Sequence, residues 1–198
     1  MDTNLLKHCE KFVRDIFLNS DKNFFYHNIN HIEEVVENAN KICSYLKIEP
    51  EETETVIIAA WFHDSFYINS PKNHESESAN IAESFLIEHN YPKEKIDLVR
   101  GCILATKIPQ SPKNILEEIL CDADLFHVGC ENFFLRNELY KKEIKNQFNS
   151  KISDKEFIQN SISFFSAHKF LSNYAKEFLE EQKQQNIQKL KKQLESYK

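Results

Sequence analysis

Glycine and proline are scarce in this sequence of 198 residues. There are only two glycines, Gly101 and Gly129, and five prolines. Tight hairpin turns depend on glycine for backbone angles that other residues avoid, so many β-hairpins are not expected here. Apolar residues recur instead at spacings of three and four, among many Leu, Glu, Lys, Ala and Gln residues. We therefore predict an all-α fold.

Paired cysteines and long apolar runs are also missing. The five cysteines are odd in number and include no CxxC pair: 9, 43, 102, 121 and 130. The start of the sequence carries no secretory apolar segment, so a reducing, cytoplasmic location is expected. No apolar run approaches the roughly 18 residues that a membrane span needs, so we expect no membrane partner.

An excess of positive charge is absent as well. The formal net charge is −6, which disfavours long-range attraction to a nucleic-acid polymer or to anionic lipid. A small phosphorylated ligand remains compatible with this charge, because a local cation or metal ion can outweigh the field of the whole molecule.

Helical periodicity extends along most of the chain. Asn28 is a good N-cap for the second expected helix, and Pro50 is expected in the break before the third. Pro109 and Pro112 are expected to end the fifth helix. Gly129 is expected to cap the end of the sixth. The expected helices span about 3–18, 28–46, 52–64, 75–89, 93–107, 114–128, 131–147 and 154–168.

The C-terminal part, from about 170 to 198, is rich in Glu, Gln and Lys. Its apolar stripe is sparse and consists of Phe178, Ile187, Leu190 and Leu194. We interpret it as a long, solvated helix laid along the body, and the alternative is a helix-pairing contact in a homodimer. Without internal repeats or a linker, we predict one domain over 1–198, with a helical extension from about 150.

Polar residues in apolar surroundings are the most informative feature of the sequence. His63 and Asp64 follow Ala-Ala-Trp-Phe at the end of the most apolar helix. Each would cost on the order of 1 to 3 kcal/mol if buried without a partner. A purely structural His–Asp pair is one interpretation of this dipeptide.

Two further positions favour a functional site. His31 shares a helical face with Ile32, Val35 and Ala39, so its imidazole is aimed at the core. Asp122 and Asp124 lie among apolar residues of a later helix, where packing alone would favour aliphatic side chains. The pattern predicts nitrogen and oxygen ligands converging from three helices. Such ligands suit one divalent ion, Mn, Fe, Co, Ni, Zn or Mg, and without a nearby thiolate pair a closed structural zinc site is disfavoured.

Five blocks of sequence resemble the HD-domain metal-dependent phosphohydrolases. In chain order they are YHNINHIEEVV at 26–36, AAWFHDSFY at 59–67, HESESA at 74–79, ILATKIPQ at 103–110 and CDADLFHVG at 121–129. The resemblance covers about residues 24–140 and implies a single-domain helical bundle of the HD type.

The resemblance also implies a ligand set. It assigns the metal to His31, His63, Asp64 and Asp124, leaving Asp122 a supporting or structural role. A second ion is not expected, because only His74 and His89 supply imidazoles between the His-Asp pair and Asp124. His27 precedes His31 by one helical turn and could chelate with it, but in the resemblance it lines the pocket and contacts substrate.

Glu75, Lys107 and His74 complete the predicted site. Glu75 could simply favour a helix start, but the resemblance implies a general acid or base, with Asp64 counted among the catalytic groups. Lys107 is either an ordinary residue of a helix end or a phosphate ligand that neutralises developing charge. His74 is expected to contact substrate, whereas His127 is more typical of a packing or surface histidine, with a contact to the site as the alternative.

The predicted function is that of a metal-dependent phosphohydrolase. An activated water would cleave a phosphomonoester or phosphodiester bond of a small phosphorylated substrate, by resemblance a nucleotide. The alternative is a sensor or regulatory module that keeps the ion and a nucleotide without catalysis. A weaker third interpretation is a helical scaffold with a buried His–Asp network and no ion.

Overall fold

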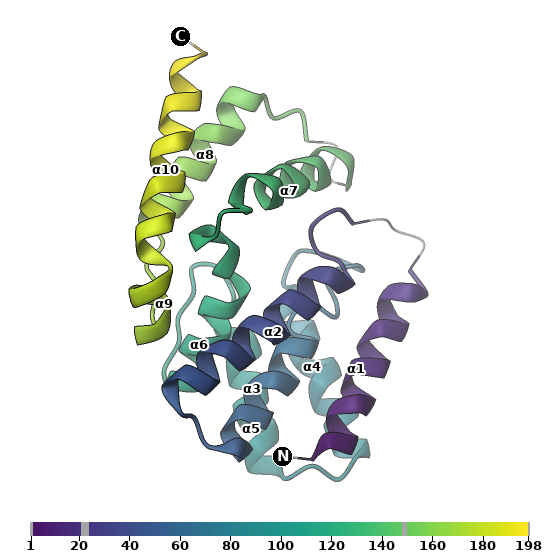
Figure 1. The fold of residues 1–198 in the computed structure, drawn as a ribbon. Helices are drawn as coiled ribbons and strands as arrows, with labels where there is room; N and C mark the ends of the chain where they lie inside the picture. The colour runs from purple at the N-terminus through teal and green to yellow at the C-terminus, as the bar shows by residue number, and fades with distance from the viewer. Residues whose placement is uncertain (1, 21–23, 148–149, 198) are drawn as a thin grey trace. The chain divides into compact units, whose positions relative to one another are not determined.

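The computed structural model describes residues 2–20, 24–147 and 150–197. Over these residues the chain forms ten α-helices and one 3-10 helix, with no strand. Figure 1 labels the α-helices in their arrangement. The all-α prediction is therefore confirmed. No helix in these ranges is both long enough and apolar enough to cross a membrane.

The chain separates into two compact units. The first unit comprises Met1–Asn23 and His27–Asp124, and the second comprises Phe24–Tyr26 and Leu125–Lys198. The proposed single domain over 1–198 stays a prediction, and its last residue lies outside the described part of the chain.

The first unit is a bundle of six helices, in which five surround a buried central helix. Residues Val56 to Phe62 of the central helix are all buried, as its unbroken apolar sequence predicts. The helix contacts α1, α2, α4, α5 and α6 (Figure 1). The helices are α1 (Thr3–Leu18), α2 (Ile29–Leu46), the central α3 (Pro50–Phe62), α4 (His74–Glu88), α5 (Lys93–Ala105) and α6 (Ile115–Asp124).

The second unit has its own apolar core. Phe133, Phe165 and Phe170 are buried there together with aliphatic residues of the C-terminal helix, including Ile187 and Leu190. The C-terminal helix, α10, contacts α8, α9 and the 3-10 helix η1. The elements are η1 (Phe126–Gly129), α7 (Phe133–Gln147), α8 (Asp154–Ala167), α9 (Asn173–Phe178) and α10 (Glu180–Glu195).

Several expected helix ends are wrong by a few residues. Pro50 is the first residue of α3 and not part of the break, which suits a residue that needs no N–H partner at that position. The sixth helix ends at Asp124, and a 3-10 helix takes over residues expected to be α-helical up to 128. Gly129 is not a left-handed cap, because no described glycine has a positive φ.

The prediction of one apolar stripe along the C-terminal part is only partly correct. Ile187 and Leu190 are buried, but Phe178 is 51% exposed. The extension is not one continuous helix, since α9 ends at Phe178 and α10 begins at Glu180. The interruption lies at Leu179, between the two helices.

Candidate metal centre

Helix α2 places His31 at its first turn. The Asn28 side chain caps this helix by accepting hydrogen bonds from the backbone N–H groups of Asn30 at 3.0 Å and His31 at 3.3 Å. The cap fixes the start of the helix, and with it the direction of the His31 side chain. His31 is buried, as its position on the apolar stripe predicts.

The end of α3 supplies the adjacent pair His63 and Asp64, both buried. His63 Nδ1 lies 2.7 Å from the carbonyl oxygen of Ala60. Because a carbonyl oxygen can only accept, Nδ1 carries the proton of this hydrogen bond. The local helix end thus fixes the ring and aims Nε2 away from the backbone, which is how protein imidazoles are commonly prepared as metal ligands.

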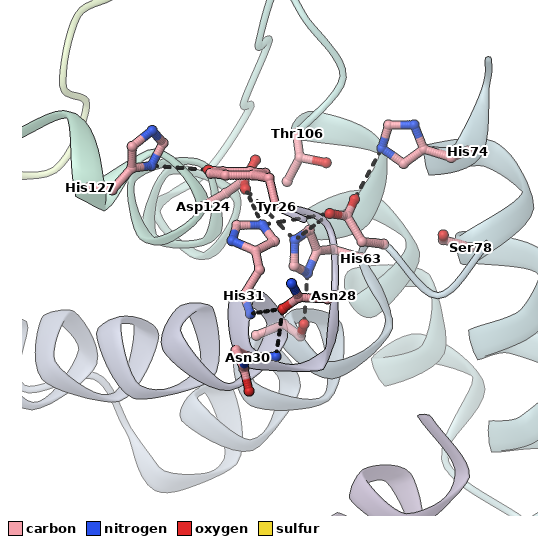
Figure 2. Close-up of polar contacts among 12 residues, drawn as sticks. Tyr26, Asn28, Asn30, His31, His63, His74, Ser78, Thr106, Asp124 and His127 are labelled. Carbon is pink, nitrogen blue, oxygen red and sulfur yellow. Dashed lines mark hydrogen bonds and ion pairs between the residues drawn. The ribbon is translucent and has the colours of Figure 1, made fainter. Parts of the chain in front are cut away.

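Asp124 is the last residue of α6 and completes the cluster (Figure 2). Its Oδ1 lies 3.2 Å from His31 Nε2 and 3.7 Å from His63 Nε2. One ligand atom from each of these three residues lies within 4.8 Å of the other two. The convergence of His31, His63 and Asp124 expected from the sequence is therefore present in the structure.

Asp64 faces the same two imidazoles. Its Oδ2 lies 3.6 Å from His31 Nε2 and 3.4 Å from His63 Nε2. The four predicted ligand side chains thus present two imidazole nitrogens and two carboxylate oxygens to a common region, and all four belong to the first unit.

The donor set fits a divalent cation. His63 Nε2 is buried and has no hydrogen-bond partner among the described residues, although two carboxylates lie at ion-pair distance. A buried polar atom in that position is costly unless a ligand satisfies it. Imidazole and carboxylate together are typical ligands of first-row divalent ions.

The charges of the cluster are strongly interdependent. Burial opposes ionisation of the Asp64 and Asp124 carboxyls, but the facing imidazoles outweigh it and hold the pKa of both well below its usual range. Burial also opposes protonation of His63, yet the two carboxylates raise its pKa to about 9, whereas burial dominates at His31 and lowers the pKa of that imidazole. The His63 ring therefore faces both carboxylates in a charge-stabilised arrangement.

His74 and Glu75 open helix α4 beside this cluster. His74 Nε2 lies 3.1 Å from Asp64 Oδ1 and 3.8 Å from Glu75 Oε1. Burial opposes the charged ring of His74, but its contact with Asp64 prevails and raises the pKa to about 8. Glu75 is itself 8% exposed, so this acidic residue is not the solvated helix start that its position alone would favour.

Lys107 and His27 lie at the edge of the site. Lys107 is exposed, and its Nζ lies 3.4 Å from Oδ1 of Asn73, the residue before His74. The half-buried His27 stacks on Tyr67, with ring centroids 3.7 Å apart, and lies edge-on to His31 at 5.7 Å. The substrate roles of His27, His74 and Lys107 stay predictions.

Tyr67 is a residue beside the site that the sequence pattern did not indicate. Its ring is 5% exposed and lies between His27 and His74, with a ring-centroid distance of 4.9 Å to the latter. A tyrosine three residues after Asp64 could have been suspected, since it belongs to the same turn: its backbone N–H donates to Asp64 O at 2.9 Å.

The sequence also drew attention to Asp122 and His127. Asp122 is fully buried, in keeping with a structural role. His127 belongs to η1 in the second unit, where its Nδ1 lies 3.1 Å from the Tyr26 hydroxyl.

Comparisons with known proteins agree with this architecture. The sequence model of the HD domain matches residues 28–129. A crystal structure of a predicted HD superfamily hydrolase from an uncultured Thermotogales bacterium is similar over 97% of this chain and 92% of that one, with a TM-score of 0.65 and 19% identity. The Lin1889 protein from Listeria innocua is similar over 96% and 97%, with a TM-score of 0.61 and 20% identity. No curated protein matches the sequence.

Proposed function

The chain belongs to the HD-domain family, and we propose that it is a metal-dependent phosphohydrolase acting on a small nucleotide-like substrate. The observation that carries this proposal is the buried cluster of His31, His63 and Asp124, joined by Asp64. These four side chains would hold one divalent ion. The bond cleaved would be a phosphomonoester or phosphodiester.

The reaction needs a nucleophile, a proton carrier and compensation of negative charge. When bound, the ion supplies Lewis acidity, which lowers the pKa of water and polarises a phosphoryl oxygen. Glu75 lies beside the ligand cluster, with its Oε1 3.8 Å from Nε2 of His74. In this proposal its carboxylate carries the proton during the reaction. Lys107 is exposed just after the end of α5 and contacts Asn73, the residue before α4; it would oppose the charge that develops on phosphoryl oxygens.

Asp124 marks the side from which substrate would approach. Its side chain is 19% exposed, whereas those of His31, His63 and Asp64 are 3%, 1% and 5% exposed. A phosphate group entering on that side would meet the ligand cluster without displacing the buried imidazoles. The half-buried ring of His27 would line this approach.

A turnover assay with a nucleotide panel tests the proposal. The metal-free protein would be loaded with Mn²⁺, Co²⁺ or Ni²⁺ and incubated with nucleoside mono-, di- and triphosphates and cyclic nucleotides. Release of phosphate or nucleoside should depend on the metal and fall at least about 100-fold in Asp64→Ala, the loss that an essential metal ligand implies. His89→Ala, at the opposite end of α4, is the matched control and should retain full activity.

Two results would contradict the proposal. One is an absence of turnover with every metal and nucleotide, and the other is unchanged turnover in Asp64→Ala. A nucleotide that binds tightly in the presence of metal but stays intact for hours would support the alternative, a sensor or regulatory module without catalysis.

A further inference from the structure

Both ring nitrogens of His74 are engaged by the protein itself. Nδ1 lies 2.8 Å from the carbonyl oxygen of Pro71, and Nε2 lies 3.1 Å from Asp64 Oδ1. We propose that His74 is a positioning residue, which holds the Asp64 carboxylate in the orientation that metal binding requires and does not itself contact substrate. This inference rests on the metal centre proposed above.

The loop before α4 fixes the ring of His74. A carbonyl oxygen can only accept, so Nδ1 donates to Pro71, and this bond turns Nε2 toward Asp64. Tyr67 packs against the same ring at an interplanar angle of 70°. The His74 side chain is 16% exposed, and both of its nitrogens already have partners within the protein.

The two oxygens of Asp64 consequently face different partners. Oδ2 is directed to the imidazoles of His31 and His63, at 3.6 and 3.4 Å, while Oδ1 faces His74. Rotation of the carboxylate about its terminal bond would break the contact with His74. The contact therefore fixes the plane of the carboxylate, so that one oxygen is held by His74 and the other is left facing the ion. Removal of hydrogen-bonded partners of this kind commonly changes metal affinity or activity 10- to 100-fold.

The same geometry separates His74 from its sequence neighbour. Glu75 Oε1 is 3.8 Å from His74 Nε2, beyond hydrogen-bond distance, so the stronger contact of His74 is with Asp64. Glu75 thus keeps its carboxylate for proton transfer, and His74 keeps its second nitrogen for the metal ligand.

Two substitutions separate hydrogen bonding from packing. His74→Phe keeps a ring against Tyr67 but has no N–H, whereas His74→Gln keeps an N–H donor for Asp64. The dissociation constant for Mn²⁺ would be measured by titration calorimetry, and the visible spectrum of the Co²⁺-loaded protein would report on the ligand geometry. We expect His74→Phe to bind Mn²⁺ about 10- to 100-fold more weakly than wild type and to change the Co²⁺ spectrum. His74→Gln should bind more tightly than His74→Phe.

His89→Ala is the control for loss of an imidazole. His89 also donates from Nδ1 to a backbone carbonyl, that of Phe85 at 2.8 Å, but it lies at the far end of α4. Its substitution should leave Mn²⁺ affinity and the Co²⁺ spectrum unchanged.

Equal Mn²⁺ affinity in His74→Phe, His74→Gln and wild type would overturn the inference. Unchanged affinity together with a raised KM would instead make His74 a substrate contact. The Mn²⁺ affinity and the Co²⁺ spectrum need no substrate, so failure of the proposed hydrolase activity would leave a positive result for His74 intact. Conversely, metal-dependent turnover with unaltered metal affinity in His74→Phe would reject only the positioning role.

Discussion

At the scale of single residues, burial decides how each polar group behaves. His63 and Asp64 are 1% and 4% exposed, where an isolated charge would cost several kcal/mol. They are tolerated because each carboxylate faces imidazoles and His63 Nδ1 donates to Ala60. Among the described residues, His63 Nε2 has no hydrogen-bond partner, and a cation is the simplest group that would satisfy this buried nitrogen.

The buried thiols give a test of these surroundings as a function of pH. Burial favours the neutral thiol and raises the pKa of Cys9 to about 12 and that of Cys43 to about 11. Because the thiolate is the reactive form, these cysteines should be nearly inert at pH 8 and gain reactivity only as pH rises toward those values. An unshifted thiol should react about 100-fold faster than Cys43.

Iodoacetamide labelling followed by peptide mass spectrometry measures this difference. In the native protein at pH 8 we expect modification first at Cys130, which is only half-buried. Cys9 and Cys43 should react after denaturation. Native labelling of Cys43 as fast as in denaturant would show that the described core is wrong.

The cap of α2 connects local structure with the ligand cluster. Asn28→Ala removes the acceptor of two backbone N–H groups and should cost about 1 kcal/mol of unfolding free energy. It should also weaken metal binding, because His31 stands in the turn that the cap fixes. Asn28→Asp retains an acceptor and is the control. Thermal unfolding and Mn²⁺ titration of both variants check this expectation, and equal stability of Asn28→Ala and wild type would contradict it.

At the scale of helices, the proposed metal ligands lie at or next to helix ends and not in the middle of helices. Asp124 is the last residue of α6, His63 follows the last residue of α3, and His31 lies in the first turn of α2. Side chains at helix ends can converge on one point without interrupting the apolar packing between helices. This arrangement explains how a mostly apolar bundle accommodates the cluster.

Gly129 is required by a close approach of two segments. A Cβ built at this residue would lie 2.5 Å from both Cβ and the carbonyl oxygen of Leu179. Backbone there cannot yield as a flexible side chain can, so Gly129→Ala should destabilise the second unit by about 1–3 kcal/mol or more. The free energy of unfolding in urea measures the loss.

Gly101→Ala is the matched control, a second substitution of glycine by alanine. Its added Cβ would lie 3.0 Å from Glu117 Oε1, at the end of a flexible side chain, and alanine favours the helix by about 1 kcal/mol. We expect its stability to stay within about 1 kcal/mol of wild type. A smaller loss for Gly129→Ala than for Gly101→Ala would contradict the packing described for Leu179.

The sequence predicted the elements better than their ends. The start of α2 was predictable because Asn28 is a strong local capping signal, and the burial of α3 followed from its continuous apolar sequence. Two features were not predictable from the sequence, because tertiary packing determines both. They are the end of α6 at Asp124 and the exposure of Phe178. The contact of His74 with Asp64 was missed for the same reason, because a loop brings them together.

At the scale of the whole molecule, the site belongs to one compact unit. All four proposed ligands, and also His74, Glu75 and Lys107, lie between His27 and Asp124 of the first unit. The second unit has a separate core and a separate polar pair, Tyr26 and His127. Ion binding is therefore expected to stabilise the first unit directly.

Metal addition should raise the stability of the chain. An ion that binds the folded but not the unfolded protein adds about 2.7 kcal/mol at a free concentration 100 times its dissociation constant. Calorimetric unfolding with and without Mn²⁺ should show this increase in wild type and little of it in Asp124→Ala. An equal increase in both proteins would place the stabilising ion elsewhere.

The most direct measurement is the metal content of the purified chain. After equilibrium dialysis against Mn²⁺ or Co²⁺, elemental analysis should give about one ion per chain for wild type and His89→Ala, as an open site with four protein ligands predicts, and a small fraction of one for Asp64→Ala and Asp124→Ala. An ion-free wild-type chain, or full occupancy in both aspartate variants, would contradict the convergence of His31, His63, Asp64 and Asp124 on one cation.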